Sequence, residues 1–341
     1  MDEKPNDFTA QTKVGKMAIR KDMKTFDFDD VMLVPKKGIL HSRSQADVSV
    51  SLGGRTFNIP AVPANMSTII DENLAEYLAK NGYFYIIHRF DIDPVQFVKD
   101  FNEKDLFTSI SLGVKEADYK KVDELSEEGL SPDYITIDIA HGHAQTVIDM
   151  IKYIKEILPE TYVIAGNVGS VEGALELEEA GADCIKVGIA PGFVCTTGPN
   201  TGFGTRGYQL SSVEEVADAL QTADLIADGG IRKYGDIAKA IALGADMVMV
   251  GSMFAGHDEN PGEVVEDEEG KQFKVYFGSA SDFQKGEKKY VEGRKELMPY
   301  KGAISETLRT IKENLQSSVS YAGGRELSDL RNVEYVLLNN Y

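Results

Sequence analysis

The chain has 341 residues, of which 42% are hydrophobic and two are cysteines, and its formal net charge is −19 at pH 7. This acidity argues against a protein that binds nucleic acid or an anionic membrane surface, although loop amides can still bind the phosphate of a small ligand. Two cysteines cannot build a disulfide framework, and we find no signal peptide and no apolar run long enough to span a bilayer, so we expect a cytoplasmic protein.

The N-terminal part of the chain lacks the regular pattern of the later residues. Residues 1–25 are polar and aperiodic, which predicts an N-terminal arm. Two short segments, Phe26–Pro35 and Ala46–Ser51, precede the regular pattern. We interpret them as an N-terminal lid segment made of loops and short strands.

From Ile59 onward an apolar run, a loop and an amphipathic helix follow one another repeatedly. The candidate strands are Ile59–Asn65, Tyr83–His88, Phe107–Gly113, Tyr134–Ile139, Tyr162–Gly166, Cys184–Val187, Leu225–Asp228 and Met247–Gly251. Eight such units predict an α/β fold, a closed (β/α)8 TIM barrel, within one catalytic domain over residues 26–341. The alternative, a doubly wound open sheet, seldom contains eight regular units.

Several predicted helices carry end signals. These are Asp71 as the cap of 72–80, Asp93-Pro94 before 95–101, Ser211 with Glu214 as a capping box before 216–220, and Gly244 after 236–243. Past Gly256 the regularity stops, and a segment over about 257–300 is rich in turn-forming and charged residues. A long irregular segment after the last barrel strand is typical of an active-site flap. A helix over 303–315 and a tail complete the chain.

The most distinctive stretch is the loop Gly188–Gly198, which follows the apolar run Cys184–Val187 and contains three glycines and a proline. Cys195 stands in its middle beside two threonines. A cysteine kept for packing is usually found inside an apolar run, as Cys184 is. We therefore interpret Cys195 as a nucleophile, which requires a lowered pKa or a nearby base.

Other polar and glycine residues fall at the C-terminal ends of predicted strands, where barrel enzymes carry their chemistry. They include Arg89, Asp138, Asn167, Asp228-Gly229-Gly230 and Gly251-Ser252. The glycine amides after strands seven and eight predict a nucleotide monophosphate site, with Asp228 accepting hydrogen bonds from ribose hydroxyls. Thr197 is a candidate for holding a leaving group or a water. Glu292 on the flap is a candidate proton carrier, although by itself it resembles any solvated carboxylate.

Five motifs are spread over most of the chain from Phe26 onward. They are Phe28–Val31, Ser42–Ser44, Ala165–Val168, Gly192–Thr197 and Asp228–Gly230. With these motifs the chain resembles the inosine-monophosphate dehydrogenase and guanosine-monophosphate reductase family. The combination of a Cys-Thr-Thr loop after strand six with Asp-Gly-Gly after strand seven is highly specific.

Two departures favour the reductase branch of that family. Dehydrogenases usually carry a pair of regulatory modules after strand two, whereas only Arg89 to Leu106 separates strands two and three here. The dehydrogenase flap also carries an Arg-Tyr pair, and this chain has Lys289-Tyr290. The run from Phe277 to Gly293 looks like the bacterial reductase form. A dehydrogenase without regulatory modules and a non-catalytic nucleotide-binding regulator remain the alternatives.

The resemblance implies NADPH-dependent reductive deamination of GMP to IMP and ammonia, through a covalent thioimidate on Cys195 with help from Thr197 and Glu292. The implied GMP contacts are Asp228, Gly229, Gly230, Gly251, Ser252, Ser279, Ala280 and Gly293. The implied NADPH contacts are Arg89, Asp138 and Ala190, with Ser42 and Arg43 from a neighbouring subunit of a homotetramer.

The resemblance also implies a monovalent cation, such as potassium, bound by backbone carbonyls. The matching positions are Ala190, Gly192 and Cys195. Family members usually have glycine at the first of these positions. Alanine keeps the carbonyl oxygen while restricting the backbone.

Overall fold

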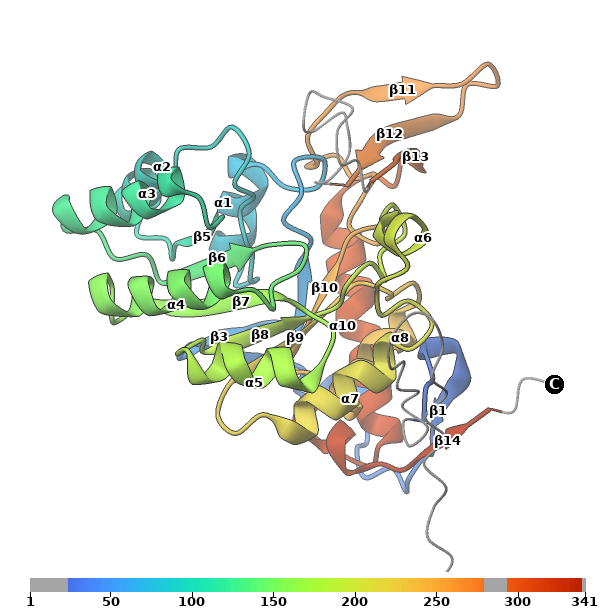
Figure 1. The fold of residues 1–341 in the computed structure, drawn as a ribbon. Coiled ribbons are helices and arrows are strands. Elements are labelled where there is room, and N and C mark those ends of the chain that lie inside the picture. The colour runs from blue at the N-terminus through green and yellow to red at the C-terminus, as the bar shows by residue number, and fades with distance from the viewer. Residues whose placement is uncertain (1–23, 279–292, 339–341) are drawn as a thin grey trace, which may run out of the picture.

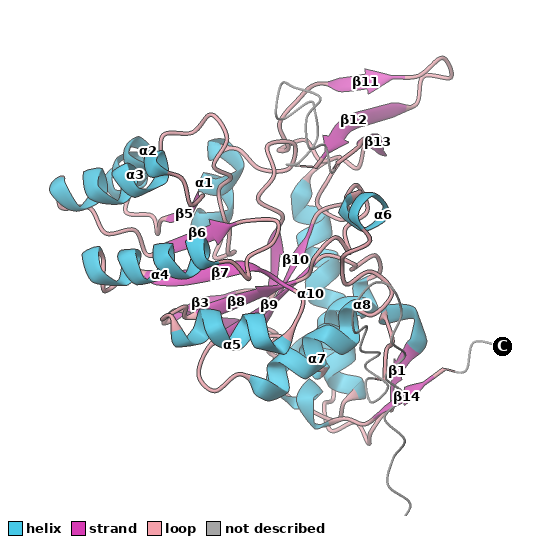
Figure 2. Cartoon of the chain, viewed as in Figure 1, coloured by secondary structure: helices cyan, strands magenta, loops and turns pink. Residues whose placement is uncertain are grey.

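The computed structural model of the chain describes residues 24–278 and 293–338. Nearly all of the predicted arm, and the middle of the predicted flap, therefore lie outside the described residues. Within the described residues, a curled parallel sheet is surrounded by helices (Figures 1 and 2), as the alternating pattern of a TIM barrel predicts.

Seven strands form the sheet, in the spatial order β4-β10-β9-β8-β7-β6-β5, and every neighbouring pair is parallel. Their bounds are β4 Ala61–Pro63, β5 Ser109–Leu112, β6 Tyr134–Asp138, β7 Tyr162–Val168, β8 Cys184–Val187, β9 Asp224–Asp228 and β10 Met247–Val250. The prediction of an α/β barrel is confirmed. The carboxyl ends of all seven strands lie at one end of the sheet, so the βα loops gather there.

The second of the eight predicted strands, Tyr83–His88, is not assigned as a strand, and this one prediction is wrong. The segment is extended and buried beside β5, where the Ile87 amide donates to the Ser109 carbonyl at 3.1 Å. The Ser111 hydroxyl, rather than a main-chain amide, donates to the Ile87 carbonyl at 2.6 Å. Because side chains satisfy part of its backbone, the segment packs in the strand position without a regular ladder.

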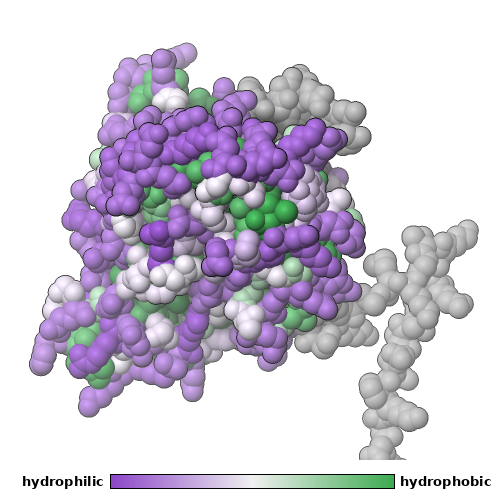
Figure 3. Space-filling view, turned by 90° about the vertical axis from the view of Figure 1, so that its left-hand side faces the viewer, coloured by the Kyte–Doolittle hydropathy of each residue, from purple (hydrophilic) through white to green (hydrophobic). Residues whose placement is uncertain are grey.

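Eight α-helices of eight or more residues are found among residues 24–278 and 293–338. They are α1 Glu72–Lys80, α2 Pro94–Glu103, α3 Glu116–Glu127, α4 Gln145–Ile157, α5 Val171–Glu179, α7 Gln209–Ala219, α8 Tyr234–Ala242 and α10 Ile304–Tyr321. The face that carries α2, α3 and α4 is mostly hydrophilic (Figure 3), in keeping with the acidic composition. In the described part of the chain, no helix has both the length and the apolar character that a membrane crossing requires.

Three of the four helix end signals are confirmed and one is wrong. Asp93 caps α2, its carboxylate accepting a hydrogen bond from the Val95 amide at 3.1 Å, and Pro94 is the first helical residue. The Asp71 carboxylate accepts a hydrogen bond from the Leu74 amide at 2.9 Å, and Gly244 follows α8 with φ +105°. The box at Ser211 is wrong, because α7 begins two residues earlier. The Ser211 hydroxyl lies inside the helix and accepts a hydrogen bond from the Phe26 amide at 3.3 Å, which ties the N-terminal segment to the barrel.

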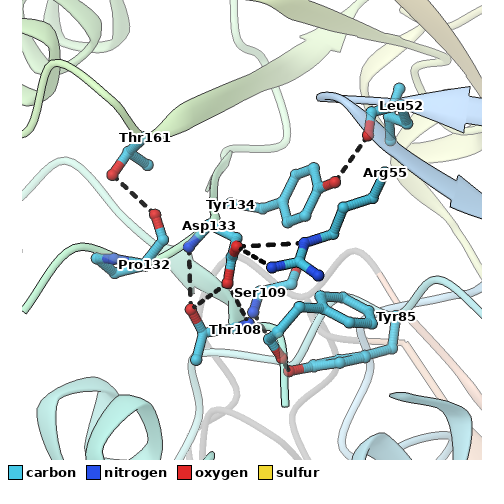
Figure 4. Close-up of polar contacts among 10 residues, drawn as sticks. Leu52, Arg55, Tyr85, Thr108, Ser109, Pro132, Asp133, Tyr134 and Thr161 are labelled. Carbon is cyan, nitrogen blue, oxygen red and sulfur yellow. Dashed lines mark hydrogen bonds and ion pairs between the residues drawn. The ribbon is translucent and has the colours of Figure 1, made fainter. Parts of the chain in front are cut away.

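The N-terminal segment forms short elements, as expected. The elements are η1 Phe28–Asp30, β1 Val31–Leu33, η2 Arg43–Gln45, β2 Val50–Leu52 and β3 Arg55–Phe57, and β1 pairs with β14 Tyr335–Leu337. Two strands of this segment, β2 and β3, pair as an antiparallel hairpin that covers the opposite end of the barrel from the βα loops. The Tyr134 hydroxyl at the start of β6 donates to the Leu52 carbonyl at 2.7 Å (Figure 4). The hairpin therefore closes the N-terminal end of the strands.

Asp133 is the centre of the polar contacts at this end (Figure 4). Its carboxylate accepts from the Arg55 guanidinium at 2.6 Å and from the buried Thr108 amide at 2.8 Å. Asp133→Ala is expected to lower the free energy of unfolding by about 1–3 kcal/mol, because the Thr108 amide loses its partner. Urea denaturation at one protein concentration measures this change.

The matched control for Asp133 is Glu116→Ala, which removes an exposed i,i+4 ion pair with Lys120 on α3. We expect this control to change the stability by no more than about 0.5 kcal/mol. Equal effects of the two substitutions would show that the Asp133 contacts do not support the hairpin.

The predicted flap is more regular than expected. It contains a three-stranded antiparallel sheet of β11 Val264–Glu266, β12 Gln272–Phe277 and β13 Lys295–Pro299. The strand β12 buries Lys274 together with Tyr276, and the Lys274 ammonium donates to the Asn260 carbonyl at 2.7 Å. A lysine on the inward face interrupts the apolar alternation by which a strand is usually identified.

Candidate functional site

The cysteine loop begins at Gly188, directly after β8. Its amide donates to the Val168 carbonyl at 2.8 Å, and its φ of +146° suits glycine. A Cβ built at this position would lie 2.1 Å from the Asp228 carbonyl oxygen. Glycine therefore lets the loop pass directly against the end of β9.

The loop then turns back and presents Cys195. Ala190 has φ +58°, and the Cys195 amide donates to the Gly192 carbonyl at 3.3 Å. The Cys195 thiol is partly exposed and donates to the Thr197 hydroxyl at 3.3 Å, at the start of the short helix α6 Thr197–Thr201. The structure thus brings together the predicted nucleophile and the predicted threonine.

Cys184 differs from Cys195 in its surroundings. It is fully buried within β8, and burial raises the pKa of its thiol well above the ordinary value. A thiol with a raised pKa stays protonated and is a poor nucleophile. This contrast supports the assignment of a packing role to Cys184.

The predicted phosphate-binding turn Gly229-Gly230 packs against the cysteine loop. Both glycines have positive φ values, +84° and +81°. A Cβ on Gly229 would lie 3.1 Å from the Pro191 side chain and 3.3 Å from the Gly192 amide. The turn after β9 and the loop after β8 therefore form one continuous backbone surface.

A buried lysine, which the sequence analysis did not identify as a site residue, joins two of the predicted acidic residues. Lys186 in β8 is only 2% exposed, and its ammonium lies 2.6 Å from Asp228 and 3.4 Å from Asp138. Burial alone would lower the pKa of Lys186, but the two carboxylates outweigh it and raise the pKa. The sequence did contain one sign of this role, because Lys186 is a charged residue inside the otherwise apolar run Cys184–Val187.

Asn167 completes this cluster. Its amide nitrogen donates to the Asp228 carboxylate and to the Gly188 carbonyl, both at 2.7 Å. The Asp228 carboxylate is therefore held by a cation and an amide, while the same amide fixes the start of the cysteine loop. The arrangement orients Asp228 at the carboxyl end of β9.

The flap sheet approaches the same end of the barrel. A Cβ on Gly251 would lie 2.3 Å from the Tyr276 hydroxyl of β12, and the Lys301 ammonium donates to the Ser252 carbonyl at 2.9 Å. Gly293 pairs with Cys195 as an isolated antiparallel bridge. Of the predicted flap contacts, Gly293 thus meets the cysteine loop, while Ser279, Ala280 and Glu292 lie outside the described residues.

The predicted cofactor residues are found in different places. Arg89 lines a cavity of about 180 Å³ together with Lys121, Ser111 and the buried His88, whose pKa is lowered by burial. Asp138 belongs to the Lys186 cluster and Ala190 to the cysteine loop. Ser42 and Arg43 lie against α10, where the Arg43 guanidinium donates to the Tyr321 hydroxyl at 3.2 Å.

The carbonyls expected to bind a monovalent cation already face a positive charge. One nitrogen of the Arg206 guanidinium, Nη2, donates to the Gly192 carbonyl at 2.7 Å and to the Cys195 carbonyl at 3.1 Å. A cation bound by these two oxygens would lie against the guanidinium and be repelled by it. The residues present therefore do not fit a potassium ion at this position.

Comparisons with known proteins identify the family of this chain. A family model described as "IMP dehydrogenase / GMP reductase domain" matches residues 25–340. A "GMP reductase" of Ligilactobacillus salivarius (strain UCC118) is 59% identical over 319 residues, which are 93% of this chain and 98% of that protein. A "GMP reductase" of Bacillus subtilis (strain 168) is 57% identical over 316 residues, 92% of this chain and 96% of that protein. The chain therefore belongs to the IMP dehydrogenase / GMP reductase family.

Proposed function

We propose that this chain is a GMP reductase that catalyses the NADPH-dependent reductive deamination of GMP to IMP and ammonia. The observation that best supports this proposal is the position of Cys195, in a loop that packs against the Asp228-Gly229-Gly230 turn. Relatives named "GMP reductase" that match over more than nine-tenths of the chain support the same activity. A reductase is an oxidoreductase, so the names of these relatives also support that enzyme class.

The proposed chemistry begins at the Cys195 sulfur. The sulfur attacks C2 of the purine, and the bond from C2 to the exocyclic nitrogen breaks as that nitrogen takes up a proton and leaves as ammonia. The product is a thioimidate, in which Cys195 is bonded to C2. Covalent catalysis replaces one difficult displacement by two easier steps.

Thr197 and Glu292 are proposed to handle the proton. The Thr197 hydroxyl lies 3.3 Å from the Cys195 sulfur, within reach of a group leaving from C2. Glu292, outside the described residues, directly precedes Gly293, which pairs with Cys195. Its place in the sequence supports a carboxyl group at the reacting centre.

The nucleotide is proposed to lie across the ends of β9 and β10. The amides of Gly229, Gly230, Gly251 and Ser252 would receive the phosphate, and the Asp228 carboxylate would accept from the ribose. Ser279 and Ala280, in the flap outside the described residues, would complete the GMP contacts.

The nicotinamide cofactor is proposed to lie near Arg89, Asp138 and Ala190. The guanidinium of Arg89, which lines one cavity, would pair with an anionic group of such a cofactor. When bound, the reduced nicotinamide supplies a hydride to C2. The Cys195 sulfur then leaves C2 and returns to its thiol form, ready for another cycle.

We also propose a cytoplasmic homotetramer in which Ser42 and Arg43 reach the cofactor of a neighbouring subunit. In one chain these residues lie on the exposed surface beside α10, which leaves Ser42 accessible to another copy. A tetramer would bring this surface of one subunit next to the cofactor site of its neighbour.

The proposed activity is tested with two pairs of substrates. We expect the enzyme with GMP and NADPH to consume the reduced cofactor, with one IMP and one ammonia formed per turnover. The control mixture contains IMP and NAD⁺. Turnover of the control pair with none of GMP would instead identify a dehydrogenase without regulatory modules.

A further inference from the structure

The side chain of Arg206 binds the two ends of the turn that carries Cys195. Its Nη2 donates to the Gly192 carbonyl at 2.7 Å and to the Cys195 carbonyl at 3.1 Å. The Gly192 carbonyl also accepts from the Cys195 amide at 3.3 Å. One nitrogen of the guanidinium therefore fixes the orientation of both carbonyls in the turn.

The backbone next to Arg206 is anchored to the beginning of the same loop. The Thr205 amide donates to the Ile189 carbonyl at 2.7 Å, and the Ile189 amide donates to the Thr205 hydroxyl at 3.1 Å. Thr205 is 1% exposed, and its hydroxyl also contacts Gln209 of α7 at 2.5 Å. Arg206 thus extends from a rigid point at Ile189 to the carbonyls beside the nucleophile.

A glycine permits this close approach. Gly204 has φ +153°, and a Cβ there would lie 2.9 Å from the Ile189 carbonyl oxygen. Ala190, with φ +58°, turns the chain between the anchor and the arginine contacts. The loop is consequently held at Ile189, Gly192 and Cys195.

Converging backbone carbonyls are the usual ligands of a monovalent cation. A guanidinium carries the same charge permanently and adds directed hydrogen-bond donors. Because like charges repel at this separation, a bound cation and the observed Arg206 contacts exclude each other.

We propose that Arg206 replaces the monovalent cation of the cysteine loop, as a positioning residue that holds Cys195 in its reactive orientation. The proposal rests on the proposed GMP reductase function for its kinetic consequences. The wild-type enzyme then needs no potassium, since the required charge is part of the chain.

The first experiment measures turnover of GMP in choline chloride and in potassium chloride at equal ionic strength. Wild-type kcat is expected to be the same in both salts. Arg206→Ala in choline chloride is expected to lose about 10²-fold in kcat, because a small displacement of the nucleophile is costly. KM for GMP is expected to stay nearly unchanged, since Arg206 is outside the proposed GMP contacts.

The loss is expected to be reversed when the missing charge is supplied. Millimolar guanidinium chloride, or potassium chloride, should restore much of the kcat of Arg206→Ala and leave the wild type unaffected. Arg206→Lys should keep part of the activity. The matched control is Arg309→Ala, an exposed arginine whose ion pairs, to Glu306 and Glu313, lie on its own helix α10, and it should behave as wild type.

A second readout is independent of turnover. Cys184 is fully buried, so iodoacetamide added to the native enzyme reports on Cys195. Arg206→Ala should raise the alkylation rate several-fold by releasing the loop, and guanidinium should lower it again.

Either of two results would overturn the role of Arg206. One is a wild type that requires potassium. The other is an Arg206→Ala variant whose kcat and alkylation rate match wild type in choline chloride. An absence of GMP turnover in the wild type as well as in the variants would contradict the proposed GMP reductase function but not the role of Arg206. The alkylation rates would then decide that role.

Discussion

Cys195→Ala is expected to abolish turnover of GMP while preserving its binding. Loss of a covalent nucleophile typically costs about 10⁴-fold or more in kcat, because the remaining groups cannot form the intermediate. The proposed phosphate and ribose contacts belong to the ends of β9 and β10, so removal of one sulfur leaves them intact. Stopped-flow kinetics gives the loss of kcat, and isothermal titration calorimetry gives the Kd for GMP.

Cys184→Ala is the matched control for Cys195→Ala. It also removes one sulfur, but from the core of β8, where the side chain is fully buried. We expect it to lower stability by about 1–3 kcal/mol while turnover remains close to wild type. Activity of Cys195→Ala near that of wild type, or equal loss in both variants, would show that the nucleophile is wrongly assigned.

The parts of the fold that the sequence predicted best are those determined by local chemistry. Asp71 caps its helix, and Gly244 ends another, because these residues satisfy nearby backbone groups wherever the chain continues. The repeat of apolar runs and amphipathic helices identified seven of the eight strand positions. The Cys195 loop and the Gly229-Gly230 turn follow their strands and therefore meet at the same end of the barrel.

The parts that were missed depend on contacts between distant residues. Lys186 resembles many other lysines in sequence, and its role depends on Asp138 and Asp228, each more than 40 residues away. Arg206 contacts backbone carbonyl groups, and because every residue has one, the sequence does not show which of them it binds. The segment 83–88 is apolar enough for a strand. However, a side-chain hydrogen bond from Ser111 takes the place of part of its backbone pairing with β5.

Lys186→Met is expected to disrupt the site more than any other change in the core. The substitution keeps the aliphatic length but leaves the Asp138 and Asp228 carboxylates without their shared cation. Removal of one partner of a buried ion pair typically costs about 3–5 kcal/mol, and the partial exposure of the two carboxylates favours the lower end. Turnover is expected to fall about 10²-fold, because Asp228 loses the contact that orients it.

The pH dependence of stability gives a further check on this ion pair. Burial lowers the pKa of Lys186, but the carboxylates of Asp228 and Asp138 outweigh it, so the folded-state pKa is raised. A raised folded-state pKa gives stabilisation that is complete below the unfolded value, about 10.4, and is lost as the pH rises through the folded value. The stability difference between wild type and Lys186→Met should therefore be constant from about pH 6 to 9 and shrink only above about pH 10.5.

A double variant separates the charge of Lys186 from its shape. Lys186→Met combined with Asp228→Asn removes one uncompensated carboxylate, so it should recover part of the stability lost in Lys186→Met alone. It should not recover turnover, because the proposed ribose contact needs the Asp228 carboxylate. Lys155→Met, which breaks the more exposed pair with Asp183, serves as the control and should cost less than Lys186→Met. If Lys186→Met proved no more costly than Lys155→Met, the buried cluster would not be what holds Asp228 at the end of β9.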